Sequence, residues 1–113
     1  MIKRFDTVLL EEAMEFLRKQ NVKPKNKILQ NIERASQKTD PKLFKKLQGE
    51  IWEFRTLYSG LQYRLLAFWD KTDKGDTLVL ATHGTIKKTN KVDHKEIDKA
   101  ERIRQQYFKD KQL

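Results

Sequence analysis

The chain has 113 residues, which suits one modest domain, and 25 Lys and Arg against 16 Asp and Glu give it a net charge of +9. This excess of cations favours a polyanionic partner: nucleic acid, an anionic membrane surface or an acidic protein. The lack of cysteine excludes disulfides, thiolate metal sites and a cysteine nucleophile. The first residues contain no apolar segment long enough for a signal peptide or a membrane span, so we expect one cytoplasmic domain over 1–113, without a membrane partner.

The first half of the chain predicts one strand followed by helices. The short stretch IKRFDTV, residues 2–8, is typical of an edge strand. Apolar residues then recur at helical spacing over 10–20 and over 25–39, which predicts two helices. The following TDPKLFKKL predicts a further helical segment, because Asp40 can cap a helix and Pro41 suits its first position.

The second half changes to strand composition and ends in a helix. Residues 50–69 are rich in aromatic and β-favouring side chains and are divided by Ser-Gly at 59–60, which predicts a hairpin. Residues 77–88 form a third strand of the same character. Asp93 and Glu96 have the spacing of a capping box that begins a last helix. We therefore expect an α+β fold: a small antiparallel sheet, made of the N-terminal strand and a three-stranded meander, with the N-terminal helices and the C-terminal helix on one face.

Cations recur on one side of the predicted strands. Because side chains alternate along a strand, Arg55 and Arg64 point away from the aromatic residues, and His83 shares a face with Lys87. We expect Arg55, Arg64 and Lys87 to converge on the face that the helices leave open. Such a face contributes little packing, so Arg64→Ala is expected to leave thermal stability nearly unchanged.

Each of these residues also has a structural explanation that the sequence leaves open. A strand arginine is often an ion-pair partner, and Glu53 is an obvious neighbour for one. Lys87 and Lys88 could guard a strand end against aggregation. His83 is either a hydrogen-bonded structural histidine or a functional one, and Gly84 marks either a bulge or a close backbone approach.

No pattern in the sequence predicts a metal or a cofactor. There is no Gly-rich phosphate loop and no acidic cluster of the kind that two-metal nucleases use. His83 and His94 alone would make a weak metal site. What remains is a basic face, on which guanidinium groups can bind phosphate bidentately and lysines can act as mobile point charges.

An ordered set of motifs resembles a known family. From Leu43 to Tyr107 the pieces IWEFR, YRLLAFW, HGTIKKT and EIDKAERIR follow one another as they do in the phage-derived, HigB-like branch of the RelE/ParE toxin superfamily. Members of this superfamily are small basic toxins of type II toxin–antitoxin modules. The RelE and HigB branches cleave messenger RNA in the ribosomal decoding site, whereas the ParE branch poisons DNA gyrase.

The resemblance implies roles for particular residues. The implied catalytic and RNA-binding positions on the strands and at the strand exit are Arg55, Arg64, Lys87, Lys88 and Lys91. In the implied chemistry the ribose 2′-hydroxyl attacks the neighbouring phosphate without a metal, and basic residues stabilise the transition state. His83 is a candidate catalytic base, and Tyr107 is a second candidate for proton transfer.

Three functional hypotheses follow. The first is a RelE-like, ribosome-dependent messenger RNA endonuclease, neutralised by a cognate antitoxin that we expect to be a helix-turn-helix protein from an adjacent gene. The second is a ParE-like inhibitor that binds gyrase without being an enzyme. The third is a basic domain that only binds an antitoxin or nucleic acid. Fold alone does not separate them.

Overall fold

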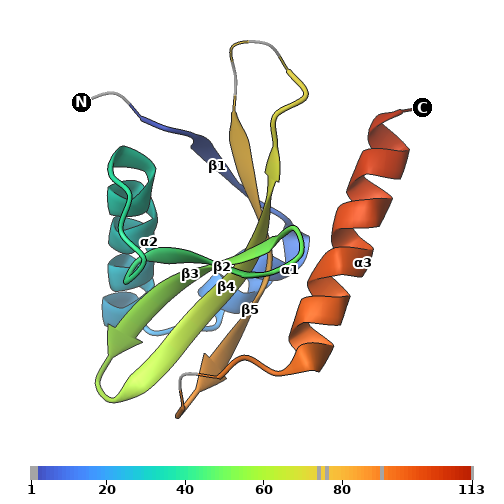
Figure 1. Cartoon of the computed structure of the whole chain (residues 1–113). Coiled ribbons are helices and arrows are strands. Elements are labelled where there is room, and N and C mark those ends of the chain that lie inside the picture. The colour runs from blue at the N-terminus through green and yellow to red at the C-terminus, as the bar shows by residue number, and fades with distance from the viewer. Residues whose placement is uncertain (1–2, 74, 76, 90, 113) are drawn as a thin grey trace.

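The computed structural model describes residues 3–73, 75, 77–89 and 91–112, and it is built around a five-stranded sheet with the order β1-β5-β4-β3-β2 (Figure 1). The elements in chain order are β1 (Asp6–Leu9), α1 (Glu11–Arg18), α2 (Val22–Gln37), β2 (Phe44–Gln48), β3 (Ile51–Tyr58), β4 (Leu61–Asp70), β5 (Leu78–Lys87) and α3 (His94–Lys111). The predicted α+β class is confirmed. No helix in these described ranges has the length and apolarity needed to cross a membrane.

The strand pairing confirms the predicted meander and edge strand. β1 pairs with β5 in parallel and the other three pairings are antiparallel. β1 is an edge strand as predicted, although it begins at Asp6, and residue 2 of the predicted strand lies outside the described residues. At the hairpin between β3 and β4, Ser59 and Gly60 have φ values of 52° and 79°. Two consecutive positive φ angles match the twist of the flanking strands, which explains the tight turn.

The helix predicted after Asp40 is wrong, because this segment forms β2 instead. Asp40 makes one turn: its Oδ1 accepts a hydrogen bond from the backbone N–H of Lys42 at 2.9 Å. The chain then enters a strand in which Phe44 stacks on Trp52 and Phe54, with ring centroids 4.9 and 4.5 Å apart. Burial of this ring across the sheet outweighs a local capping preference.

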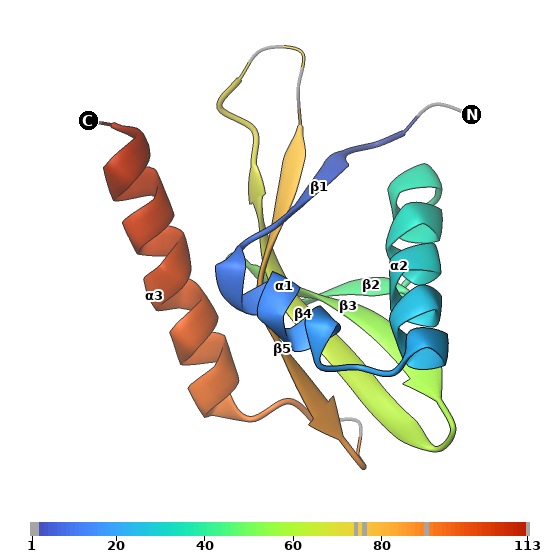
Figure 2. The same ribbon diagram turned by 180° about the vertical axis from the view of Figure 1, so that it is seen from behind.

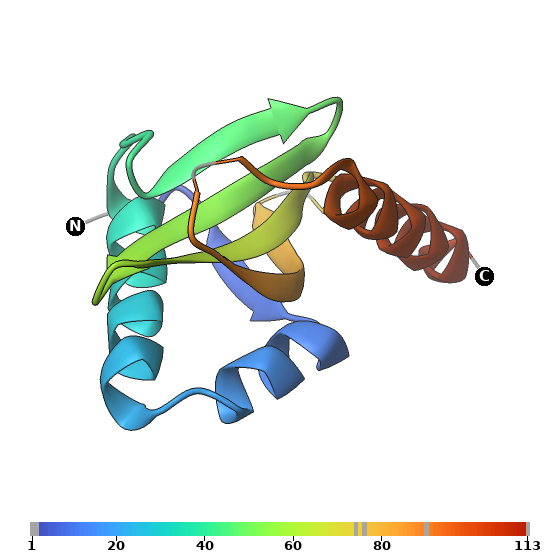
Figure 3. The same cartoon turned by 90° about the horizontal axis from the view of Figure 1, so that it is seen from below.

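The expectation that the helices share one face of the sheet is also wrong, since they cover both (Figures 2 and 3). α1 and α2 pack on one face, around Ile28, Phe54 and Leu65, whereas α3 packs on the other, against Leu66 and Phe68. Residues 65–68 of β4 are all buried, so the strand is apolar on both faces where it lies between helices.

A bulge in β5 decides which side chains face α3. Leu66 pairs with His83 but Ala67 pairs with Ala81, so Thr82 is an extra residue in the ladder. The extra residue shifts the alternation and places His83 on the α3 face. Gly84 pairs regularly with Leu65 and is not the bulge, but a Cβ on Gly84 would collide with the ring of Phe16 from α1, so of its two predicted roles the structure supports the close approach.

α3 is anchored near both of its ends. Asp93 caps its N-terminus as predicted, accepting a hydrogen bond from the backbone N–H of Lys95 at 3.1 Å. Near its C-terminus, Tyr107 Oη and Lys111 Nζ both donate to Oδ2 of the buried Asp70, at 2.6 and 2.7 Å. Burial pushes the pKa of Asp70 up, but the hydrogen bonds from Lys111, Thr72 and Tyr107 outweigh burial and hold the pKa well below its usual range.

We expect Asp70→Asn to lower the free energy of unfolding by about 2 kcal/mol at neutral pH, because the variant loses a charged acceptor. A carboxyl group whose pKa is depressed on folding stabilises the fold above its unfolded pKa, about 4, and this contribution fades as the pH falls further. The difference between the two proteins in urea unfolding should therefore shrink in acid. A difference that stays constant from neutral pH into acid would contradict this role.

Candidate nucleic-acid interface

α3 leaves the hairpin end of its sheet face uncovered (Figure 1). Here Arg55, Arg64 and Thr85 lie side by side on adjacent strands, and the next row holds Leu57, Gln62 and Lys87. The predicted convergence of Arg55, Arg64 and Lys87 on one face is therefore present in the strand register.

Arg64 is buried, in contrast to the exposed position expected from the sequence. Its side chain is 1% exposed and its Nη1 lies 2.9 Å from Oε2 of Glu53, which is 2% exposed. Its Nη2 donates to Oε1 of Gln62 at 2.7 Å. The ion pair with Glu53 that the sequence left open is thus formed, and it lies below the surface of the open face.

Arg55 is the arginine that a ligand can reach. Its side chain is 22% exposed, with Nε 3.5 Å from the same Glu53 oxygen and Nη1 donating to the backbone oxygen of Pro41 at 3.2 Å. Beside it an open groove of about 440 Å³ is lined by Lys42, Arg55, Thr56, Leu57 and Gln62. Lys42 lines this groove but is not among the residues predicted from the sequence, where its segment is expected to be helical.

Of the lysines at the end of β5, Lys87 lies on the same side of the sheet as Arg55. Lys87 is half-buried opposite Gln62, and Lys88 and Lys91 are exposed in the segment that leads to α3. The hydrogen bond from the Lys95 backbone lowers the pKa of Asp93, and the positive charge of Lys87 adds to this effect. Cations therefore border the open face on its β5 side as well as its β2 side.

His83 lies on the α3 face but outside the Arg55 groove. It is 4% exposed, its Nδ1 lies 2.9 Å from the hydroxyl of Thr82, and its Nε2 lies 3.5 Å from Oε1 of Glu96. It borders a separate groove of about 210 Å³ between α1 and α3, which Lys99 also lines. Burial lowers the pKa of His83 below its usual value of 6.5, with partial opposition from Glu96, so the ring is neutral at neutral pH.

Tyr107 lies far from the predicted site. Its hydroxyl donates to Asp70, which is six residues from Arg64 along β4, about 20 Å at the rise of an extended strand. Burial and this hydrogen bond raise the pKa of Tyr107. The structure therefore separates Tyr107 from the arginines.

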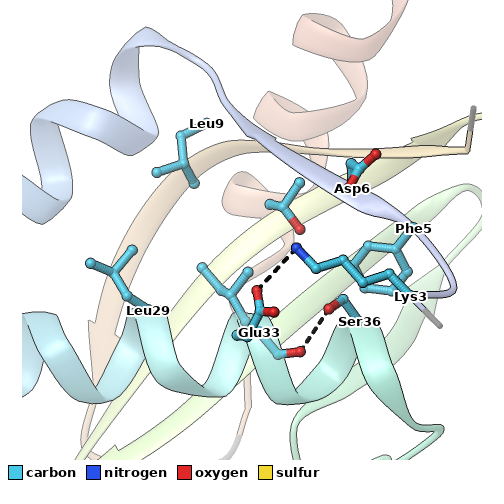
Figure 4. Close-up of a pocket in the computed structure, with 9 residues that line it drawn as sticks. Lys3, Phe5, Asp6, Leu9, Leu29, Glu33 and Ser36 are labelled. Atoms are coloured by element: carbon cyan, nitrogen blue, oxygen red, sulfur yellow. Dashed lines mark hydrogen bonds and ion pairs between the residues drawn. The ribbon is translucent and has the colours of Figure 1, made fainter. Parts of the chain in front are cut away.

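Another cavity, of about 270 Å³, lies between β1 and α2 (Figure 4). Lys3 pairs with Glu33 in it at 3.3 Å, and Ser36 donates to the backbone oxygen of Glu33 at 2.6 Å. None of the predicted site residues lines it. Within the described part of the chain, no group of three or more His, Asp or Glu side chains is placed to hold a metal ion.

We expect Arg64→Ala to destabilise the fold by about 3–5 kcal/mol, because it leaves the buried Glu53 carboxylate without its closest cation. This corrects the expectation of nearly unchanged stability. Arg34→Ala, at an exposed position on α2, is the matched control and should cost less than about 0.5 kcal/mol. Equal unfolding midpoints for the two variants would show that the buried pair does not stabilise the sheet.

The ring protons of His83 should titrate below pH 6.5 in an NMR experiment, since burial disfavours the imidazolium form. The chain has only two histidines, so His94→Gln leaves His83 as the sole imidazole signal. A midpoint at or above 6.5 would mean that Glu96 outweighs burial.

One of the comparisons with known proteins identifies a family. A family model described as phage-derived protein Gp49-like (DUF891) matches residues 15–105, which include β2 to β5 and most of α3. Comparison with curated proteins and with solved structures gave no match. The five-stranded, mostly antiparallel sheet with three helices is consistent with a RelE-like fold. The chain therefore belongs to the phage-derived Gp49-like family, within the RelE/ParE toxin superfamily.

Proposed function

We propose that this protein, as a single domain of the HigB-like branch, is the toxin of a type II toxin–antitoxin module and cleaves messenger RNA on the ribosome. The observation that carries the proposal is the groove that Lys42 and Arg55 line, on a sheet face that also holds Lys87; Lys88 is exposed just beyond the end of β5. The net charge of +9 favours association with the phosphate backbone of RNA, whatever its sequence.

In the proposed reaction the ribose 2′-hydroxyl attacks the adjacent phosphate and the 5′-oxygen of the next nucleotide leaves. The upstream fragment then ends in a 2′,3′-cyclic phosphate. Negative charge grows on the phosphate oxygens, where the partly exposed guanidinium of Arg55 can donate two hydrogen bonds and the lysines add positive charge. Arg64 supports this arrangement from below, because Glu53 joins it to Arg55.

The proposal rests on charge and alignment more than on a particular base. His83 is neutral at neutral pH, as a base must be, but it borders the groove between α1 and α3. It therefore takes part only if the RNA reaches that groove as well. Lys91 is exposed in the segment before α3 and would contact the RNA backbone rather than the reacting phosphate.

Family membership implies a cognate antitoxin. We propose that it is a helix-turn-helix protein from an adjacent gene, and that acidic segments of it oppose the basic surface of the toxin. Complementary charge speeds association and competes with RNA for the same cations.

The deciding experiment uses a programmed ribosome at fixed Mg²⁺ and a messenger RNA with a single 2′-deoxy substitution at the cut site. We expect the normal RNA to yield a cyclic phosphate and the deoxy RNA to resist cleavage. Arg55→Ala should reduce the single-turnover rate by about 100-fold, as loss of a transition-state donor does. Arg34→Ala, an exposed arginine on the opposite side of the sheet, should cut like the unmodified chain.

Efficient cutting of the deoxy RNA would rule out attack by the 2′-hydroxyl. Intact RNA together with inhibition of purified gyrase would instead assign the chain to ParE-like activity.

A further inference from the structure

A further groove lies on the opposite face of the sheet from Arg55. It has a volume of about 420 Å³ and is lined by Lys46, Glu50, Trp52, Trp69 and Lys71. The chain has only two tryptophans, and both line this groove. We call it the tryptophan groove.

The indole rings are held by the aromatic core but stay partly exposed. Trp52 stacks on Phe44, and the two indoles meet edge to face, with centroids 5.6 Å apart and planes at 73°. Both side chains are half-buried. Tryptophan held rigidly at a surface loses little entropy on binding and is over-represented among the residues that dominate protein interfaces.

The charge around the groove is mainly positive. Lys46 and Lys71 are exposed, and Glu50 is the single acidic residue in the lining. Among the described residues neither lysine forms an ion pair, although Lys71 Nζ lies 4.8 Å from the ring centroid of Trp69. An occupant with carboxylates beside apolar side chains would satisfy both the lysines and the indoles.

We propose that the tryptophan groove docks an acidic segment of the cognate antitoxin. The inference rests on family membership, which implies an antitoxin, and not on the nuclease activity proposed above. An RNA strand fits the groove less well, because a stacked base needs an open ring face. Phe44 already covers a face of Trp52, and Trp69 is surrounded by Phe5, Phe44, Trp52 and the Lys71 ammonium group.

The position of the groove connects docking to neutralisation. β2 is the outermost strand, and its alternation places Lys46 beside Trp52 and Lys45 beside Glu53, on the Arg55 face. A segment seated against the indoles and continuing over β2 would meet Lys45 and then the groove that Lys42 and Arg55 line. Docking on one face can thus hold a blocking segment over the other.

The test measures how two pairs of charge reversals change the affinity for the antitoxin encoded by the adjacent gene. Each complex is purified after the two proteins are co-expressed. Lys46→Glu with Lys71→Glu alters the groove, and Lys23→Glu with Lys109→Glu makes the same change in charge at exposed helical positions. We expect the first pair to weaken binding at least about tenfold and the second by less than about threefold. Any tryptophan in the antitoxin is replaced by phenylalanine, so that the fluorescence comes from Trp52 and Trp69 alone. This fluorescence should shift to shorter wavelength on binding, because the antitoxin removes the indoles from water.

The ribosome assay separates this inference from the proposed function. The Lys46→Glu, Lys71→Glu protein should cut messenger RNA as fast as the charge-matched Lys23→Glu, Lys109→Glu protein, but it should escape an antitoxin concentration that silences that control. Failure of the unmodified chain to cut would count against the nuclease alone. Unchanged antitoxin affinity, or unshifted emission, would overturn the docking site. The docking site would also be overturned if a single-stranded RNA of about 12 nucleotides quenched both tryptophans, and if the binding of this RNA, but not of the antitoxin, depended on Lys46 and Lys71.

Discussion

The buried ion pair between Glu53 and Arg64 is the constraint on which the candidate site depends. Removing two charges from water costs several kcal/mol for each ion, and good geometry with further hydrogen bonds is needed to offset it. The observed register of β3 and β4 provides this geometry. It sets Arg55 directly opposite Arg64 and makes Glu53 the diagonal neighbour of Arg64. A slip of one residue would move one partner to the other face.

The same carboxylate orients Arg55, the more accessible of the two arginines. Oε2 of Glu53 lies 2.9 Å from Arg64 and 3.5 Å from Arg55, so one buried acceptor holds both guanidinium groups on one face. Arg55 gains a further restraint from the Pro41 carbonyl. A guanidinium held in this way loses little freedom when it binds a phosphate, which is what positioning a reactive group requires.

α3 divides its sheet face into a covered half and an open half. Asp70 anchors the helix through Tyr107 and Lys111, and the apolar packing against Phe68 and Leu80 belongs to that covered half. After the bulge at Thr82, alternate residues of β5 face this side of the sheet, namely His83, Thr85 and Lys87. The open half is basic because Lys42, Arg55 and Lys87 lie there, and it is accessible because α3 does not cover it. The tryptophan groove lies on the other side of the same sheet. β2 separates the two surfaces, and its consecutive lysines belong one to each face.

The sequence by itself determined the features that depend on neighbours in the chain. The Ser59-Gly60 hairpin, the Asp93 cap, the alternation around Arg55 and the ordered motifs of the toxin superfamily are all local patterns, and each is present. Only the tertiary structure decided the features that depend on distant partners. β2 forms because Phe44 packs across the sheet, and α3 crosses to the second face because Leu66 and Phe68 need cover there. Burial is a sum over the whole fold, so no local pattern could show that Arg64 is enclosed while Arg55, on the neighbouring strand, remains open.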